Sequence, residues 1–247
     1  MSGHSKWSTI KRKKGANDAR RGKMFTKMIK EITVAAGEGG PDQDANPRLR
    51  SAIQNAKGIN MPKDTIQRAI NKADKDTGGF EAVSFEGMLS HGIGVFIDCL
   101  TDNRNRTVSS VRSIFNKRGG NLGTNGSLSF MFDRKGVITL PKGDLDMDEF
   151  GLEIIDAGVE EVDVEDDTIV ITTPMEDFHA VQKKMEEMGL ETESAELQRI
   201  PNDTVDLPQE QAVQIMRVIE EFEDDDDVQA VWHNLNVTDE VSAALEQ

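Results

Sequence analysis

The first residues that could do chemistry form a basic segment, residues 3–25, near the start of the chain. Eight Lys or Arg side chains stand there against one acid, Asp18, and a Trp lies near the front. Lys and Arg neutralise phosphates and release counterions, and an indole ring can stack on an unpaired base. The segment therefore predicts a nucleic-acid contact made by Lys6, Trp7, Lys11, Arg12, Lys13, Lys14, Arg20, Arg21 and Lys23. A solubilising tail or a targeting segment is the alternative interpretation.

A second group of cations lies in residues 103–118, after a predicted buried strand. The polar corner Asn103-Arg104-Asn105-Arg106 leads there into a predicted helix over residues 107–118. Arg and Asn side chains can bind phosphate, and a helix N-terminus offers backbone N–H groups beside them. We expect the same nucleic-acid contact to include Arg104, Arg106, Arg112, Lys117 and Arg118. Helix capping and a solvated helix face explain the pattern equally well.

Other patterns that resemble catalytic or cofactor sites fail on their spacing. The glycine-rich residues 119–126 precede a predicted strand, whereas a dinucleotide fingerprint must open a helix. Residues 144–155 lack the glycine and final glutamate of a calcium loop, and residues 223–227 are typical of a solvated acidic turn. The four His and the single Cys, Cys99, form no nucleophile–base or zinc pattern. The sequence thus predicts no enzyme activity, no metal and no cofactor.

The net charge of −16 over 247 residues conceals a strong partition. Residues 1–75 carry +10, residues 76–135 carry +1, and residues 136–247 carry −27. Such asymmetry indicates partners, because an acidic part repels a polyanion and turns the basic part toward it. A lone cysteine and the lack of an apolar run of ~20 residues favour a reducing cytoplasm and exclude a membrane partner.

Helical periodicity predicts three helices in the basic part of the chain, at residues 23–36, at residues 47–56 and from residues 61–64 onward. Asn46 is placed to cap the second helix, and Pro47 suits its first position. We expect these helices to form a small basic bundle.

The rest of the chain reads as two units that mix strands and helices. Residues 80–133 have the order ββαβ, with strands at 80–89, 93–100 and 127–132. Residues 136–200 have the order βαββαβ, which is typical of a ferredoxin-like unit. Residues 203–235 form a strand, a helix and a strand, too few elements to bury their own core. We therefore expect them to complete the ββαβ unit around the inserted acidic one.

The predicted fold class is α+β, with an N-terminal three-helix domain and two α+β domains, the acidic ferredoxin-like one inserted into the other. The expected boundaries are 1–77 for the basic arm and helical domain, 78–134 plus 202–247 for the middle domain, and 135–201 for the inserted domain.

Five stretches together resemble the YebC family: GHSKW, RRGKMFTK, DANPRLRSAI, DNRNRTVSSVR and GGNLGTNGS. This family includes bacterial YebC and PmpR proteins and the mitochondrial translational activator of cytochrome c oxidase. The resemblance spans essentially the whole chain and implies three domains, two of them α+β with one inserted in the other. Family members carry Glu-Gly-Tyr-Gly-Pro-Gly after the first strand of the middle domain. Here residues 86–92 depart from that pattern and read Glu-Gly-Met-Leu-Ser-His-Gly.

Charge and resemblance together lead to one functional expectation with one alternative. The resemblance implies a DNA-binding transcriptional regulatory protein, without enzyme activity. The alternative, also implied by the resemblance, is a translation factor that binds ribosomal RNA and relieves stalled elongation. The expected partner is nucleic acid, with ribosomal or transcription proteins beside it, and no small-molecule substrate.

Overall fold

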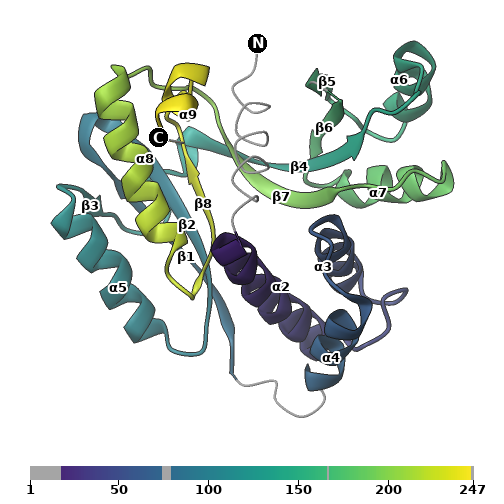
Figure 1. The fold of residues 1–247 in the computed structure, drawn as a ribbon, viewed down its shortest axis with the longest axis horizontal. Coiled ribbons are helices and arrows are strands. Elements are labelled where there is room, and N and C mark those ends of the chain that lie inside the picture. Colours follow the sequence, from purple (N-terminus) through teal and green to yellow (C-terminus); the bar gives the residue numbers. More distant parts are fainter. Residues whose placement is uncertain (1–17, 74–78, 166, 246–247) are drawn as a thin grey trace. The chain divides into compact units, whose positions relative to one another are not determined.

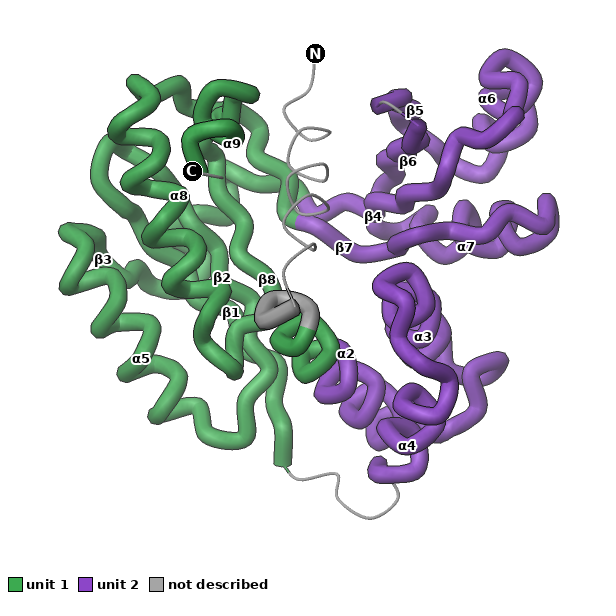
Figure 2. The backbone as a smooth tube through the Cα atoms, viewed as in Figure 1, with its two compact units in different colours: residues 1–27, 78–133, 199–247 green, residues 28–77, 134–198 purple. Residues whose placement is uncertain are grey.

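The computed structural model describes residues 18–73, 79–165 and 167–245 of the chain. The chain separates into two compact units, which Figure 2 colours differently. The first unit comprises Met1–Lys27, Gly78–Asp133 and Arg199–Gln247, and the second comprises Met28–Thr77 and Arg134–Gln198. Two sheets and flanking helices make the fold α+β, as predicted.

The sheet of the first unit has the strand order β3-β1-β2-β8. Its centre is an antiparallel hairpin of β1 (Glu81–Met88) and β2 (Gly94–Thr101). A short 3-10 turn, Ser90–Gly92, joins the two strands, and His91 adopts a φ of 62° there. β8 (Val228–His233), from the far end of the sequence, pairs antiparallel with β2. The sheet therefore combines segments that the sequence keeps far apart.

Two helices cover one face of this sheet, α5 (Arg104–Lys117) and α8 (Gln209–Glu223) (Figure 1). Val111, Ile114 and Phe115 of α5 are buried because their spacing places them on one side of the helix. The Phe115 ring lies 4.9 Å from that of Phe222 on α8, centre to centre. A Cβ on Gly87 of β1 would come within 2.4 Å of the Phe115 ring. The close fit of helix on strand thus requires glycine at this position.

The other face of the sheet holds a smaller apolar cluster, formed by Phe96, Leu128, Phe132 and Trp232. A polar group lies beside it, where Asp98 accepts hydrogen bonds from Trp232 (2.9 Å) and from Arg199 (3.2 Å). The Arg199 guanidinium also lies 4.3 Å above the ring of Phe96. Both faces of β2 are therefore covered. The short helix α9 (Asp239–Leu245), which the sequence did not predict, follows β8.

The sheet of the second unit has the order β5-β6-β4-β7, the arrangement of a ferredoxin-like βαββαβ unit. Its elements follow the predicted order: β4 (Phe132–Pro141), α6 (Met147–Ile155), β5 (Glu161–Glu165), β6 (Thr168–Pro174), α7 (Phe178–Glu187) and β7 (Ser194–Pro201). Ile138, Ile154 and Val181 lie in its core. The ferredoxin-like prediction is confirmed.

The three predicted helices are present as α2 (Asp18–Gly39), α3 (Pro47–Gly58) and α4 (Lys63–Ala73). Asn46 caps α3, because its side-chain oxygen accepts a hydrogen bond from Leu49 N at 3.1 Å. The division between the two units falls within α2, after Lys27. The division into three domains at residues 77, 134 and 201 remains a prediction.

Two predictions about residues 119–132 were wrong. Residues 127–132 do not form a separate strand: Ser129–Met131 makes a 3-10 turn, and Phe132 begins β4. The edge strand is instead β3 (Asn121–Leu122), within the stretch predicted to be a loop, and it pairs with β1. The physical reason is Glu86, a buried side chain of β1. Its carboxylate accepts hydrogen bonds from the backbone N–H groups of Gly126 (2.6 Å) and Leu128 (2.8 Å), which bends this segment into a compact loop.

Candidate nucleic-acid interface

The basic segment lies only partly within the described residues. Lys6, Trp7, Lys11, Arg12, Lys13 and Lys14 fall outside them, and their role remains a prediction. Arg20 and Arg21 belong to the first turn of α2, with side chains outside the description. Lys23 is described, and its Nζ lies 2.7 Å from Oδ1 of Asp224, in the turn after α8.

The polar corner at residues 103–106 is the start of α5 and not a loop before it, so the predicted helix start at residue 107 was three residues late. Asn103 caps the helix, because its side-chain oxygen accepts from Arg106 N at 3.1 Å. Thr101 holds this cap in place, since its hydroxyl oxygen accepts from Asn103 N at 2.9 Å. Capping, one of the two interpretations of the corner, therefore accounts for Asn103. Arg104 occupies the first helical position and is exposed.

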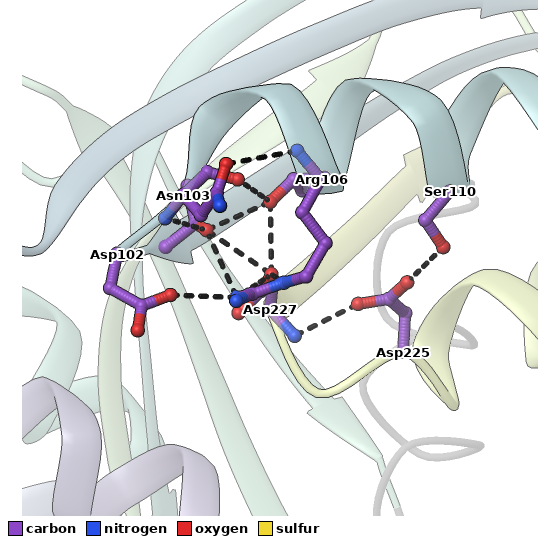
Figure 3. A network of polar contacts seen from close by, with 8 residues as sticks. Asp102, Asn103, Arg106, Ser110, Asp225 and Asp227 are labelled. Atoms are coloured by element: carbon purple, nitrogen blue, oxygen red, sulfur yellow. Dashed lines mark hydrogen bonds and ion pairs between the residues drawn. The ribbon is translucent and has the colours of Figure 1, made fainter.

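Arg106 belongs to a polar network around a buried carboxylate, that of Asp227 (Figure 3). Its Nη2 lies 2.7 Å from Asp227 Oδ2 and 2.7 Å from Asp102 Oδ1. The same Asp227 oxygen accepts from the hydroxyls of Thr107 (2.9 Å) and Thr101 (3.1 Å). Hydrogen bonds to Asp227 and then to Asp102 raise the pKa of the Arg106 guanidinium above its ordinary value. The network ties the N-terminus of α5 to the segment before β8.

Arg118 makes a similar pair at the other end of α5. Its Nε lies 2.7 Å from Glu221 Oε2 on α8, and the arginine side chain is 53% exposed.

The end of α8 also binds a lysine of α2, because Lys27 donates to the backbone carbonyl of Glu223 at 2.7 Å. Thus Lys23, Arg106 and Arg118, three cations predicted to bind phosphate, each contact a carboxylate of the α8 end or the following turn.

The remaining predicted cations of α5 are Arg104, Arg112 and Lys117. All three are exposed, and none forms an ion pair with another residue in the described part of the chain. The helix itself contains no acidic residue. Its outer surface is therefore positive and can accept an anion such as a phosphate group.

The sequence interpretation missed the acidic residues that organise this region. Residues 223–227 were expected to form a solvated turn, yet Asp227 is 5% exposed and carries the network. Asp225 accepts from the hydroxyl of Ser110 on α5, and its other oxygen accepts from Asp227 N at 2.9 Å. An acidic run directly before an apolar strand was a usable signal, because residues that enter a strand are often buried. Its partners on α5 were not visible in the sequence.

The described residues contain no group of His, Cys, Asp and Glu that could hold a metal ion. Within the same residues, no helix is both long and apolar enough to cross a membrane. Cys99 is buried, and burial raises the pKa of its thiol to about 12. A thiol of this kind is a packing group and not a nucleophile near neutral pH.

Comparison with known proteins finds similar sequences along nearly the whole chain. A family model described as "TACO1/YebC protein N-terminal domain" matches residues 5–76, and one described as "TACO1/YebC second and third domain" matches residues 80–235. A relative from Amoebophilus asiaticus, named "Probable transcriptional regulatory protein", is 50% identical over 239 residues, which are 95% of this chain and 98% of the relative. A relative from Desulforapulum autotrophicum, also named as a probable transcriptional regulatory protein, is 49% identical over 250 residues, which are 99% of this chain and 100% of the relative.

A solved structure supports the same assignment. The crystal structure of a conserved hypothetical protein from Aquifex aeolicus superposes with a TM-score of 0.77 at 40% sequence identity. The match covers 88% of this chain and 91% of that one. The motifs, the two sheets, the family models and the relatives agree, and the chain belongs to the TACO1/YebC family.

Proposed function

We propose that the protein is a non-enzymatic, cytoplasmic regulator that binds DNA in the control of transcription. The observation that carries the proposal is the outer surface of α5, where Arg104, Arg112 and Lys117 are exposed on a helix without acidic residues. The basic segment before α2 adds further cations in the sequence. The curated relatives are named as probable transcriptional regulators, which supports a regulatory role.

The mode of contact follows from the chemistry of these side chains. Arg and Lys contacts to phosphate supply affinity without sequence information. The side chains of Asn105 and Asn116 stand exposed on the same helix and can hydrogen-bond to base edges. We propose that α5 and the basic segment bind the backbone, and that these amides add the sequence preference.

Ribosomal RNA is the second candidate target. The chain carries −27 over residues 136–247, and such a charge opposes the coating of bare duplex. A protein with so acidic a part suits a defined binding site on the ribosome better than uniform binding along a duplex. Crosslinking in cells, followed by sequencing of the bound nucleic acid, separates the candidates. Promoter DNA without ribosomal RNA excludes the ribosomal target, and ribosomal RNA alone excludes the transcriptional one.

Binding in solution tests the interface itself. Arg112→Ala combined with Lys117→Ala removes two exposed phosphate contacts, so affinity for a labelled duplex should fall. The slope of log K against log salt should become shallower by about 0.9 per lost contact. Lys183→Ala is the matched control, because Lys183 is also exposed but lies on α7, in the other unit. An equal loss in the control and the α5 variant would overturn the assignment of α5.

A further inference from the structure

We infer that two solvent-accessible carboxylates at the end of α8, Glu221 and Asp224, weaken the proposed nucleic-acid contact by occupying two of its cations. The inference rests on the proposed function, because it concerns the same basic surface. Lys23 pairs with Asp224, and Arg118 pairs with Glu221, each at 2.7 Å. Both pairs lie within the first unit.

The two pairs converge on one short segment of the chain. Glu221 lies in the last turn of α8, and Asp224 is the residue that ends the helix. The cations come from elements distant in sequence, Lys23 from α2 and Arg118 from the C-terminal end of α5. One acidic segment therefore pairs with one cation from each of the two basic elements that the sequence assigns to nucleic-acid contact.

These pairs differ from the neighbouring one between Arg106 and Asp227. The Asp227 side chain is 7% exposed and is fixed by two threonine hydroxyls, so this pair belongs to the fold. The Asp224 side chain is 68% exposed and that of Glu221 is 31% exposed. Water reaches both carboxylates when their cations leave, so Lys23 and Arg118 can exchange one anion for another.

The strength of such pairs suits exchange. An exposed ion pair contributes about 1.4- to 5-fold to an equilibrium constant. A single phosphate, which must displace a tethered carboxylate, gains little. A strand that presents several phosphates at once can displace both carboxylates and release its own counterions. The carboxylates therefore act as internal competitors, which lower the affinity of the surface and which a ligand with several phosphates can still displace.

The experiment compares wild type with Glu221→Gln, Asp224→Asn and the double variant. The probes are a labelled 20-base-pair duplex, a labelled single-stranded RNA of 20 nucleotides, and inorganic phosphate as competitor. The double variant should bind the strands about 2- to 30-fold more tightly, because two exposed pairs no longer compete. Its salt slope on duplex should steepen by up to about 1.8, or 0.9 for each freed cation. Phosphate should compete more effectively against the variant than against wild type.

A matched control separates this effect from a general change in charge. Glu187→Gln removes one negative charge from an exposed pair with Lys183 on α7, at 3.5 Å. Its affinity should stay close to wild type, because this pair belongs to the other unit and holds no cation of the proposed contact. A thermodynamic cycle gives a second readout: in a Lys23→Ala background, Asp224→Asn should no longer raise affinity.

The binding measurements distinguish a failure of this inference from a failure of the proposed function. If the double variant binds with the same affinity and the same salt slope as wild type, the inference is overturned and the proposed function stands. A gain in Asp224→Asn that persists without Lys23 also overturns it. If neither wild type nor the double variant binds either strand, the proposed function fails. Binding by the double variant alone supports the inference in its strongest form.

Discussion

Replacing Asp227 by alanine should destabilise the first unit more than any other single change in the polar network of Figure 3. The Asp227 carboxylate accepts from the hydroxyls of Thr101 and Thr107, both fully buried, and from Arg106. Thr107 keeps a partner in the variant, because its hydroxyl also lies 3.2 Å from the carbonyl of Asn103. Thr101 loses its charged acceptor and keeps only the hydroxyl oxygen of Thr107, 2.8 Å away.

The magnitude follows from these contacts. Losing buried hydrogen bonds to a charged acceptor costs about 1.5–3 kcal/mol. Arg106 is 53% exposed and regains water, so its lost ion pair adds little to this cost. The backbone carbonyl of Asp227 still accepts from Leu100 N, so the segment before β8 stays paired. Asp227→Ala should therefore lower the free energy of unfolding by about 1.5–3 kcal/mol.

Urea unfolding followed by circular dichroism measures this loss. Asp102→Ala is the matched control, because it removes a carboxylate from the same arginine at 49% exposure and should cost less than about 1 kcal/mol. Hydrogen exchange should also report faster opening at the start of α5 in Asp227→Ala. Equal destabilisation by the two variants would refute the reasoning, since burial of the carboxylate would then be irrelevant.

Three further changes test other parts of the fold. Glu86→Ala removes the acceptor of two loop N–H groups and should lower the free energy of unfolding by about 1–3 kcal/mol. Hydrogen exchange in residues 121–128 should become faster, and unchanged exchange would contradict the role of this carboxylate. Gly87→Ala drives a methyl group into Phe115 and should cost about 1–3 kcal/mol in urea unfolding, whereas Gly151→Ala, where nothing lies within 4 Å, should cost nothing comparable. For Cys99, burial raises the pKa of the thiol from 9.0 to about 12. The unfolded chain releases this proton first, so stability should fall as pH rises from 9 to 12, by up to about 1.4 kcal/mol per pH unit. Urea unfolding at pH 8 and pH 10 should show this loss of stability in wild type but not in Cys99→Ala. Identical losses of stability in the two proteins would contradict a raised thiol pKa.

The elements that the sequence predicted well are those whose signal is local. Asn46 and Pro47 marked the start of α3 to the residue, because capping chemistry acts over one turn. The ferredoxin-like unit was recognisable because its six elements are consecutive in the chain. The stretch at residues 127–132 failed for the opposite reason. Its alternating apolar residues resemble a strand, but Glu86, some forty positions earlier, holds the backbone in a turn.

The candidate site was predicted only in part, because only its local features can be recognised in the sequence. Side-chain type and charge density identified the cations of α5, and the structure places Arg104, Arg112 and Lys117 on its surface. Which cations are already paired depends on contacts across the fold. Lys23 and Asp224 are 201 positions apart, and no local pattern indicates that they meet. The sequence therefore predicted the positive residues but not their carboxylate partners.

The discontinuous sheet of the first unit sets an order on how the chain can fold as it is made. The β1–β2 hairpin leaves the ribosome early, but its partner β8 follows only after residues 102–227. At about 5–20 residues per second, this delay lasts roughly 6–25 s. During that time the edge of β2 has open backbone hydrogen-bonding groups, which invite pairing with other strands. The second sheet has a shorter wait, because β7 follows its neighbour β4 after residues 142–193. A nascent chain therefore completes its later sheet first and closes its earlier sheet with β8.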